Sequence, residues 1–189
     1  AYRKSFFNHP QGAALASGRA GNVIGGGDWA EDRLIPDILG AFEKGQPVTI
    51  RNPKATRPWQ HVLEPLSGYL VLAEHLWTLG HRFAQGWNFG PKDEDARPVE
   101  WILDHMVQAW GTGASWELDQ DPQPHEANYL KLDISKARAH LHWTPSWNLE
   151  TALARIVTWH RAWLSGNDMQ AHCLDEINAY MLAMRANSN

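Results

Sequence analysis

The stretch RAGNVIGGGDWAEDRLIPDI, residues 19–38, sets three adjacent glycines between a run of small residues and a helix pattern. Glycine lets a backbone approach a ligand closely and adopt positive φ. These glycines do not open a P-loop, because no Gly-Lys-Ser/Thr follows them. Nor do they complete Gly-x-Gly-x-x-Gly, because Trp29 and Ala30 stand where the last glycine belongs. Taken alone, residues 25–27 fit an ordinary loop better than a binding loop.

Strand and helix patterns alternate on both sides of this loop. Small residues predict a strand over 13–20, and apolar residues at helical spacing predict a helix over 34–42. We expect further strands or strand-like segments at 47–51, 57–62, 87–91 and 115–118, helices at 65–80, 98–111, 135–142, 149–164 and 174–185, a loop at 119–128 and a frayed tail at 187–189. This order predicts an α/β fold with a parallel sheet early in the chain and a smaller, mainly helical lobe packed on it. A cleft between two such units is a usual place for a small-molecule site.

The composition is that of an ordered globular protein. The 189 residues are 43% hydrophobic and 20% charged, which allows a packed core. A net charge of -4 and the absence of a Lys/Arg cluster exclude a nucleic-acid footprint. The longest apolar run, near 68–73, is too short to cross a bilayer. A single cysteine, Cys173, excludes an intrachain disulfide and predicts a reducing, cytoplasmic location.

Three arginines are candidate anion ligands. Arg57 follows a turn and opens a strand-like segment, where its guanidinium could clamp a diphosphate by paired hydrogen bonds. A surface ion pair is an equally good interpretation. Arg51, at the end of the preceding strand, lies on the same rim, and Arg33, just after the glycine loop, carries the same ambiguity.

The asparagines and histidines of the chain allow similar alternatives. Asn22 lies between a strand pattern and the glycines, and Asn88 lies late in a strand pattern; at either position an amide could donate to a phosphate oxygen, although a turn-forming role is the more typical one. The close pairs at 140–142 and 61–64 do not reach a three-ligand set, so we expect no metal site. His160 is expected to be a satisfied core residue, and Cys173 a structural thiol in a helix. Residues 93–95, Asp-Glu-Asp, are expected to form a solvated loop.

Four blocks of sequence carry a family resemblance: NVIGGGDW at 22–29, RPWQHV at 57–62, WNFGPKDEDA at 87–96 and PHEANYLKLD at 124–133. With them the chain resembles the extended short-chain dehydrogenase/reductase family, the NAD-dependent epimerases and dehydratases. Within that family it resembles the 4,6-dehydratases that act on CDP-glucose in deoxysugar biosynthesis. An epimerase or decarboxylase of the same family, or a non-catalytic binding fragment, remains an alternative.

The resemblance implies a C-terminal portion of a Rossmann-type enzyme. Residues 1–25 would end the Rossmann half, and residues 26–189 would form most of the sugar-nucleotide lobe together with returning Rossmann elements. The family's catalytic Tyr-x-x-x-Lys is absent from the sequence, so we assign no catalytic residue. Gly18 stands where a larger apolar residue is expected, which predicts a loosely packed strand.

The resemblance also implies roles for the candidate residues. Asn22, Arg33, Arg51, Arg57 and Asn88 would hold CDP-glucose, chiefly at its diphosphate. Ala20 and Val23 would line the nicotinamide end of a bound NAD. The glycine loop would be one wall of this shared site, and the complete enzyme would be a homodimer.

Overall fold

The computed structural model of the chain describes residues 2–7, 9, 11–120 and 129–187. The helices in this part are α1 (Tyr2–Phe6), α2 (Leu34–Glu43), α3 (Leu63–Leu79), α4 (Val99–Trp110), α5 (Ser135–Leu141), α6 (Leu149–Leu164) and α7 (Met169–Asn187). The strands are β1 (Ser17–Ala20), β2 (Asn22–Ile24), β3 (Val48–Ile50), β4 (Trp59–His61), β5 (Gly86–Phe89) and β6 (Trp116–Leu118). Two 3-10 turns, η1 (Gly80–Phe83) and η2 (Asp93–Asp95), complete the described elements.

The strands form three parallel pairs, β1 with β5, β2 with β4 and β3 with β6. Because each pair joins strands separated by at least one helix, the parallel α/β prediction is confirmed. The chain changes sheet at Gly21, whose N–H donates to the Phe89 carbonyl, while the next N–H, of Asn22, donates to the Pro58 carbonyl. A Cβ on Gly21 would lie 2.2 Å from the Pro58 oxygen, so only glycine fits this crossover.

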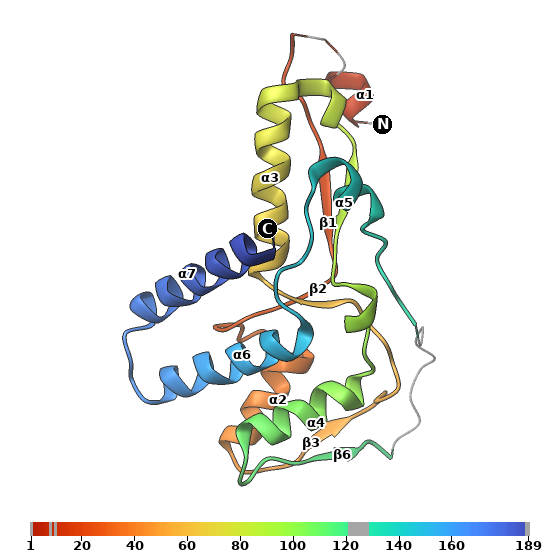
Figure 1. Cartoon of the computed structure of the whole chain (residues 1–189). Coiled ribbons are helices and arrows are strands. Elements are labelled where there is room, and N and C mark those ends of the chain that lie inside the picture. Colours follow the sequence, from red (N-terminus) through yellow and green to blue (C-terminus); the bar gives the residue numbers. More distant parts are fainter. Residues whose placement is uncertain (1, 8, 10, 121–128, 188–189) are drawn as a thin grey trace.

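Two apolar cores lie on either side of this crossover. One packs side chains of α2, α4 and α6 around β2, β3 and β4. The other packs α3, α5 and η1 around β5. Figure 1 shows the second group, with β1, at one end of the molecule and the first group at the other, with α7 along one side. The crossover at β2 therefore connects the two packed ends.

Local signals explain where several helices begin and end. The α2 helix buries Ile35, Ile38, Leu39 and Phe42. It is followed by Gly45 at φ 63°, a left-handed conformation that stops the helix. The α6 helix begins after Asn148, whose side chain accepts a hydrogen bond from the Thr151 N–H at 2.9 Å.

The predicted helices and strands match these elements, with shifts at their ends. The last helix begins at Met169 instead of residue 174, and it continues to Asn187, where the sequence predicts a frayed tail. The predicted loop at 119–128 is only partly described, since residues 121–128 lie outside the described residues, as do 188–189. Within the described part of the chain, none of the helices is long and apolar enough to span a membrane.

Two sequence-based expectations are wrong. Asp95 is buried instead of solvated, because its carboxylate accepts the Leu149 N–H at 3.0 Å in the first turn of α6. The space beside Gly18 is not loosely packed either. A Cβ there would lie 2.6 Å from Cε1 of Tyr69, because the Tyr69 ring fills the position that a larger side chain would take.

Candidate functional site

Two adjoining pockets open beside the stretch that follows the crossover. The first, of about 260 Å³, is lined by residues of β2, the following loop and the start of α2. The second, of about 240 Å³, continues past β3 to the start of β4 and α4. Both are lined by Asn22, Asp32, Leu34 and Trp59. These shared residues make the two pockets parts of one surface depression.

The three arginines predicted from the sequence all line this depression. Arg33 precedes α2 and lines the first pocket, whereas Arg51, just after β3, and Arg57, just before β4, line the second. A side-chain N–H of Arg57 (Nη1) donates to the Thr56 carbonyl at 3.0 Å, which orients its guanidinium. Among the described residues, neither Arg33 nor Arg51 forms an ion pair. The fold thus brings together cations that are 18 and 6 residues apart in the sequence.

Three carboxylates share the depression with the arginines. Asp28 and Asp32 line the first pocket, and Asp32 and Asp37 line the second. Burial raises the pKa of Asp37, as does the charge of Asp32, while Arg51 opposes that rise. Guanidinium groups are suited to phosphate oxygens, and carboxylates accept hydrogen bonds from hydroxyl groups. The depression therefore offers complementary groups to a ligand that carries both phosphate oxygens and hydroxyl groups.

Of the remaining predicted site residues, two line the depression and two do not. Asn22 lines both pockets, and Val23 lines the first. Ala20 lies at the end of β1, paired with Phe89, and lines neither pocket. Asn88 lies on β5, where its amide donates to the Asp133 carbonyl at 2.9 Å, and it lines neither pocket. The binding roles of these residues stay predictions.

Trp59 is a lining residue to which the sequence assigned no role. It lies in β4, is 9% exposed and lines both pockets. Its indole N–H is buried and has no hydrogen-bond partner among the described residues. A tryptophan directly after Arg57-Pro58 was visible in the sequence, but whether it faced a pocket depended on its packing.

The three glycines have a packing role that the sequence did not reveal. A Cβ on Gly26 would lie 2.2 Å from Cγ of Trp159, and Gly27 adopts φ 75° against the same indole. Trp29 continues this contact by packing on Trp163, with ring centroids 4.5 Å apart. Ile24 and Asp28, on either side of the glycines, line the first pocket, whereas the glycines themselves do not. Gly26 and Gly27 thus admit the indole of Trp159 from α6, whereas a Cβ on Gly25 would lie 2.9 Å from Cγ1 of Val62.

A buried network of hydrogen bonds connects α7 to α3. Glu64, which is fully buried, accepts hydrogen bonds from the N–H groups of Ser146 and Trp147 and from the Tyr180 hydroxyl at 2.7 Å. Burial raises the pKa of Glu64 even though these donors act in the opposite direction. Ser67 accepts the Trp143 indole N–H and contacts the Tyr180 hydroxyl at 3.0 Å. Helix α7 is thus held by hydrogen bonds to side chains of α3.

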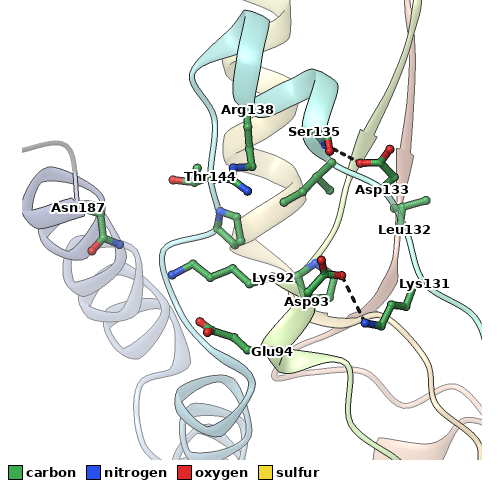
Figure 2. Close-up of a pocket in the computed structure, with 13 residues that line it drawn as sticks. Lys92, Asp93, Glu94, Lys131, Leu132, Asp133, Ser135, Arg138, Thr144 and Asn187 are labelled. Carbon is green, nitrogen blue, oxygen red and sulfur yellow. Dashed lines mark hydrogen bonds and ion pairs between the residues drawn. The ribbon is translucent and has the colours of Figure 1, made fainter.

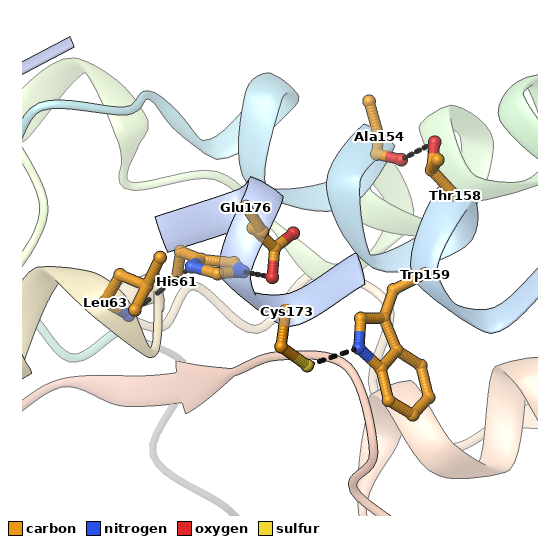
Figure 3. Close-up of polar contacts among 7 residues, drawn as sticks. All are labelled: His61, Leu63, Ala154, Thr158, Trp159, Cys173 and Glu176. Carbon is orange, nitrogen blue, oxygen red and sulfur yellow. Dashed lines mark hydrogen bonds and ion pairs between the residues drawn. The ribbon is translucent and has the colours of Figure 1, made fainter. Parts of the chain in front are cut away.

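Two more contacts from the inner face of α7 reach the segments beside the pockets (Figure 3). Oε2 of Glu176 lies 3.9 Å from Nε2 of His61. His61 is the residue of β4 that comes two positions after Trp59. Burial, followed by the charge of Arg155, lowers the pKa of His61 to about 4. The Trp159 indole N–H, whose ring packs on Gly26, donates to Cys173 Sγ at 3.3 Å. His61 is therefore neutral at pH 7, and Cys173 has the structural role expected for it.

A larger pocket lies elsewhere in the described part of the chain. It has a volume of about 590 Å³ and shares no lining residue with the arginine-lined depression. Figure 2 shows Lys92, Lys131 and Arg138 around it together with Asp93, Glu94 and Asp133, and Lys131 pairs with Asp93 at 3.4 Å. These charged side chains are exposed. Since none of the predicted site residues lines it, the depression is the better candidate.

His160 is the satisfied core residue that the sequence predicted. It is 3% exposed, and its Nε2 contacts the Glu43 carboxylate. Within the described residues, no group of three His, Cys, Asp or Glu side chains could hold a metal ion.

The sequence is 60% identical, over 187 residues, to a CDP-glucose 4,6-dehydratase of Salmonella typhimurium. In sequence, this chain therefore resembles CDP-glucose 4,6-dehydratase. The match covers 97% of this chain but only 52% of that protein, in its C-terminal part. The chain therefore spans about half the length of the relative that it matches, and no family model matches it.

Solved structures show which fold this half belongs to. A UDP-glucuronic acid 4-epimerase from Bacillus cereus has a TM-score of 0.71 at 20% identity, covering 86% of this chain and 48% of that one. A dTDP-glucose 4,6-dehydratase from Bacillus anthracis has a TM-score of 0.63 at 15% identity, covering 85% and 47%. Both were solved with NAD. The fold is the mixed α/β fold of Rossmann-type epimerases and dehydratases, as the sequence predicted.

Proposed function

We propose that this chain is the sugar-nucleotide-binding portion of a CDP-glucose 4,6-dehydratase, a hydro-lyase that converts CDP-glucose to its 4-keto-6-deoxy product. The observation that carries the proposal is the 60% identity over 97% of the chain. In this proposal residues 1–25 end the Rossmann half, and residues 26–189 form most of the substrate lobe. The homodimer, the cytoplasmic location and the place in deoxysugar biosynthesis stay predictions that follow from the same resemblance.

The arginine-lined depression supports the substrate role. A nucleotide diphosphate carries adjacent anionic groups, and Arg33, Arg51 and Arg57 line one continuous surface beside Asn22. Guanidinium forks bind such groups through paired, charge-assisted hydrogen bonds. Asp28, Asp32 and Asp37 supply acceptors for sugar and ribose hydroxyls. Asn88 is assigned to the same ligand from the resemblance alone.

The chain offers NAD one edge of a site. Ala20 and Val23 lie at the carboxyl end of β1 and within β2, where ligands of open parallel sheets bind, and both side chains are small and half-buried. When bound, NAD would supply the redox chemistry: it would accept the hydride lost from C4 of the glucose and return it to C6 after water has left across C5 and C6, so that C4 stays a ketone. The sequence contains no Tyr-x-x-x-Lys, so the residues of this chain bind and orient the substrate and do not move its protons.

Calorimetric titration with CDP-glucose, CDP and UDP-glucose tests the proposal. We expect the chain to bind CDP-glucose and CDP, and to bind UDP-glucose more weakly. Preference for UDP-glucose would favour an epimerase or decarboxylase of the same family. Failure to bind any of the three would contradict a sugar-nucleotide site in this part of the chain.

A further inference from the structure

The second pocket of the depression combines apolar walls with a few charged groups. Its apolar lining residues are Leu34, Val48, Ile50, Ala55, Trp59 and Val99. All of them except Leu34 are buried in the core around β3 and β4, so packing fixes their positions. A nucleobase is a flat ring whose hydrogen-bonding groups lie only at its edge. Apolar walls with one or two well-placed polar groups are therefore the surroundings that bind and orient such a ring.

The polar groups of this pocket come from two sides. Asn22 opens β2 and pairs with Trp59 of β4, two residues after Arg57. Asp37, in contrast, lies in the first turn of α2, which packs beside β3. A nucleotide whose diphosphate lies at Arg57 and Asn22 can therefore extend its base toward α2 and β3, where Asp37 lines the same pocket.

Asp37 has an acceptor to offer to a ligand. Its side chain is half-buried, and among the described residues its carboxylate accepts no hydrogen bond and forms no ion pair. Of the three carboxylates of the depression, Asp37 alone lines the second pocket without lining the first. A partly desolvated carboxylate without a donor is stabilised when a ligand supplies one.

The two common pyrimidines of nucleotide sugars differ at position 4 of the ring. Cytosine carries an amino group there, which donates hydrogen bonds, whereas uracil carries a carbonyl oxygen, which only accepts them. An ionised carboxylate also only accepts. It therefore pairs with the amino group of cytosine and repels the carbonyl oxygen of uracil.

We infer that Asp37 selects cytosine over uracil by accepting a hydrogen bond from the 4-amino group of a bound cytidine nucleotide. This inference rests on the proposed function, and it assigns Asp37 to the base instead of a sugar hydroxyl. The apolar walls hold the plane of the ring, the arginines hold the diphosphate, and Asp37 contacts the edge that distinguishes the two bases.

Calorimetric titration with CDP and with UDP gives the ratio of their dissociation constants. We expect the wild type to bind CDP about ten- to a hundredfold more tightly than UDP. Asp37→Asn should bring the ratio close to one, because an amide can donate to the carbonyl of uracil as well as accept from the amino group of cytosine. Loss of a negative charge strengthens the binding of both anions alike, so the ratio carries the test. Glu74→Gln, which neutralises an exposed carboxylate on α3, should leave the ratio at its wild-type value.

A second measurement uses the wild type alone and does not depend on the folding of a variant. The diphosphate of 2-pyrimidinone riboside carries hydrogen in place of the amino group, and it should bind at least about tenfold more weakly than CDP. Equal affinity for CDP and this analogue, or a preference for CDP that persists in Asp37→Asn, would overturn the inference and leave the nucleotide site in place. If neither CDP nor UDP binds the wild type, the proposed function fails, and the inference fails with it.

Discussion

The indole of Trp159 lies directly against Gly26, so closely that a Cβ on Gly26 would come within 2.2 Å of the ring. Gly26 is not in the left-handed region, so this contact and not the backbone conformation requires glycine there. The same indole donates to Cys173 on α7. The loop beside the candidate site is therefore packed against α6, and α6 against α7.

Gly26→Ala should lower the free energy of unfolding by about 1–3 kcal/mol, the usual cost of overpacking. Gly40→Ala is the matched control, since nothing lies within 4 Å of a Cβ on Gly40 in α2. That substitution should raise stability by about 0.5–1 kcal/mol through helix propensity. Urea unfolding of both variants measures the difference. Equal effects of the two substitutions would mean that Trp159 moves aside without cost.

Arg57→Ala should weaken CDP binding by about ten- to a hundredfold, the effect of losing a charge-assisted contact. Arg57→Lys should recover little, because an ammonium group cannot form paired hydrogen bonds. Asn88→Ala is an informative comparison, because its amide donates to the Asp133 carbonyl and not into the depression. Calorimetric titration with CDP is the measurement. Unchanged affinity in Arg57→Ala would place the diphosphate elsewhere.

His61 should make stability depend on pH. Its pKa is lowered to about 4 in the folded protein, so the unfolded chain binds an extra proton between pH 4 and 6.5. Stability from this group is complete above pH 6.5 and is lost as the pH falls through this window, by about 3 kcal/mol in all. Burial raises the pKa values of the neighbouring Glu64 and Glu176, which contribute with the opposite sign.

His61→Asn separates this contribution from those of the two glutamates. The variant should lose less stability than the wild type between pH 7 and 4.5 in urea unfolding. His140→Asn, at an exposed position of α5, controls for the removal of an imidazole. Parallel pH profiles of His61→Asn and the wild type would show that His61 does not carry the effect.

Tyr180→Phe should cost about 1–3 kcal/mol of stability, because it leaves the buried Glu64 short of a donor. The hydroxyl also contacts Ser67, so both partners in α3 are affected. Tyr2→Phe removes a hydroxyl from a ring that is 66% exposed and should change stability by less than about 0.5 kcal/mol. Hydrogen exchange of α7 amides should rise in Tyr180→Phe. Protection equal to that of the wild type would mean that α7 is held by other contacts.

The sequence by itself predicted the order and type of most elements, although not the short strand β2 at Asn22–Ile24. Apolar spacing marked the helices because only one stripe of each is buried, and glycine and proline marked their ends because both restrict where a helix can continue. Helix α6 was predicted at 149–164, the bounds that the structure shows. The motif blocks around 22–29 and 57–62 also identified the family fold, since they depend on residue identity alone.

Only the tertiary structure decided which residues meet. Gly26 and Trp159, or Asp95 and Leu149, are far apart in the sequence, and periodicity does not say which side chain will fill a given space. The same limit applies to the site, where Arg33, Arg51 and Arg57 line one depression because the start of α2, the end of β3 and the start of β4 lie beside it. The sequence also did not show that Leu174, Ile177, Met181 and Leu182 of α7 are exposed, for a related reason. Its inner face is held by the hydrogen bonds of Tyr180 and Cys173, so the apolar side of the helix is not the side that packs on the protein.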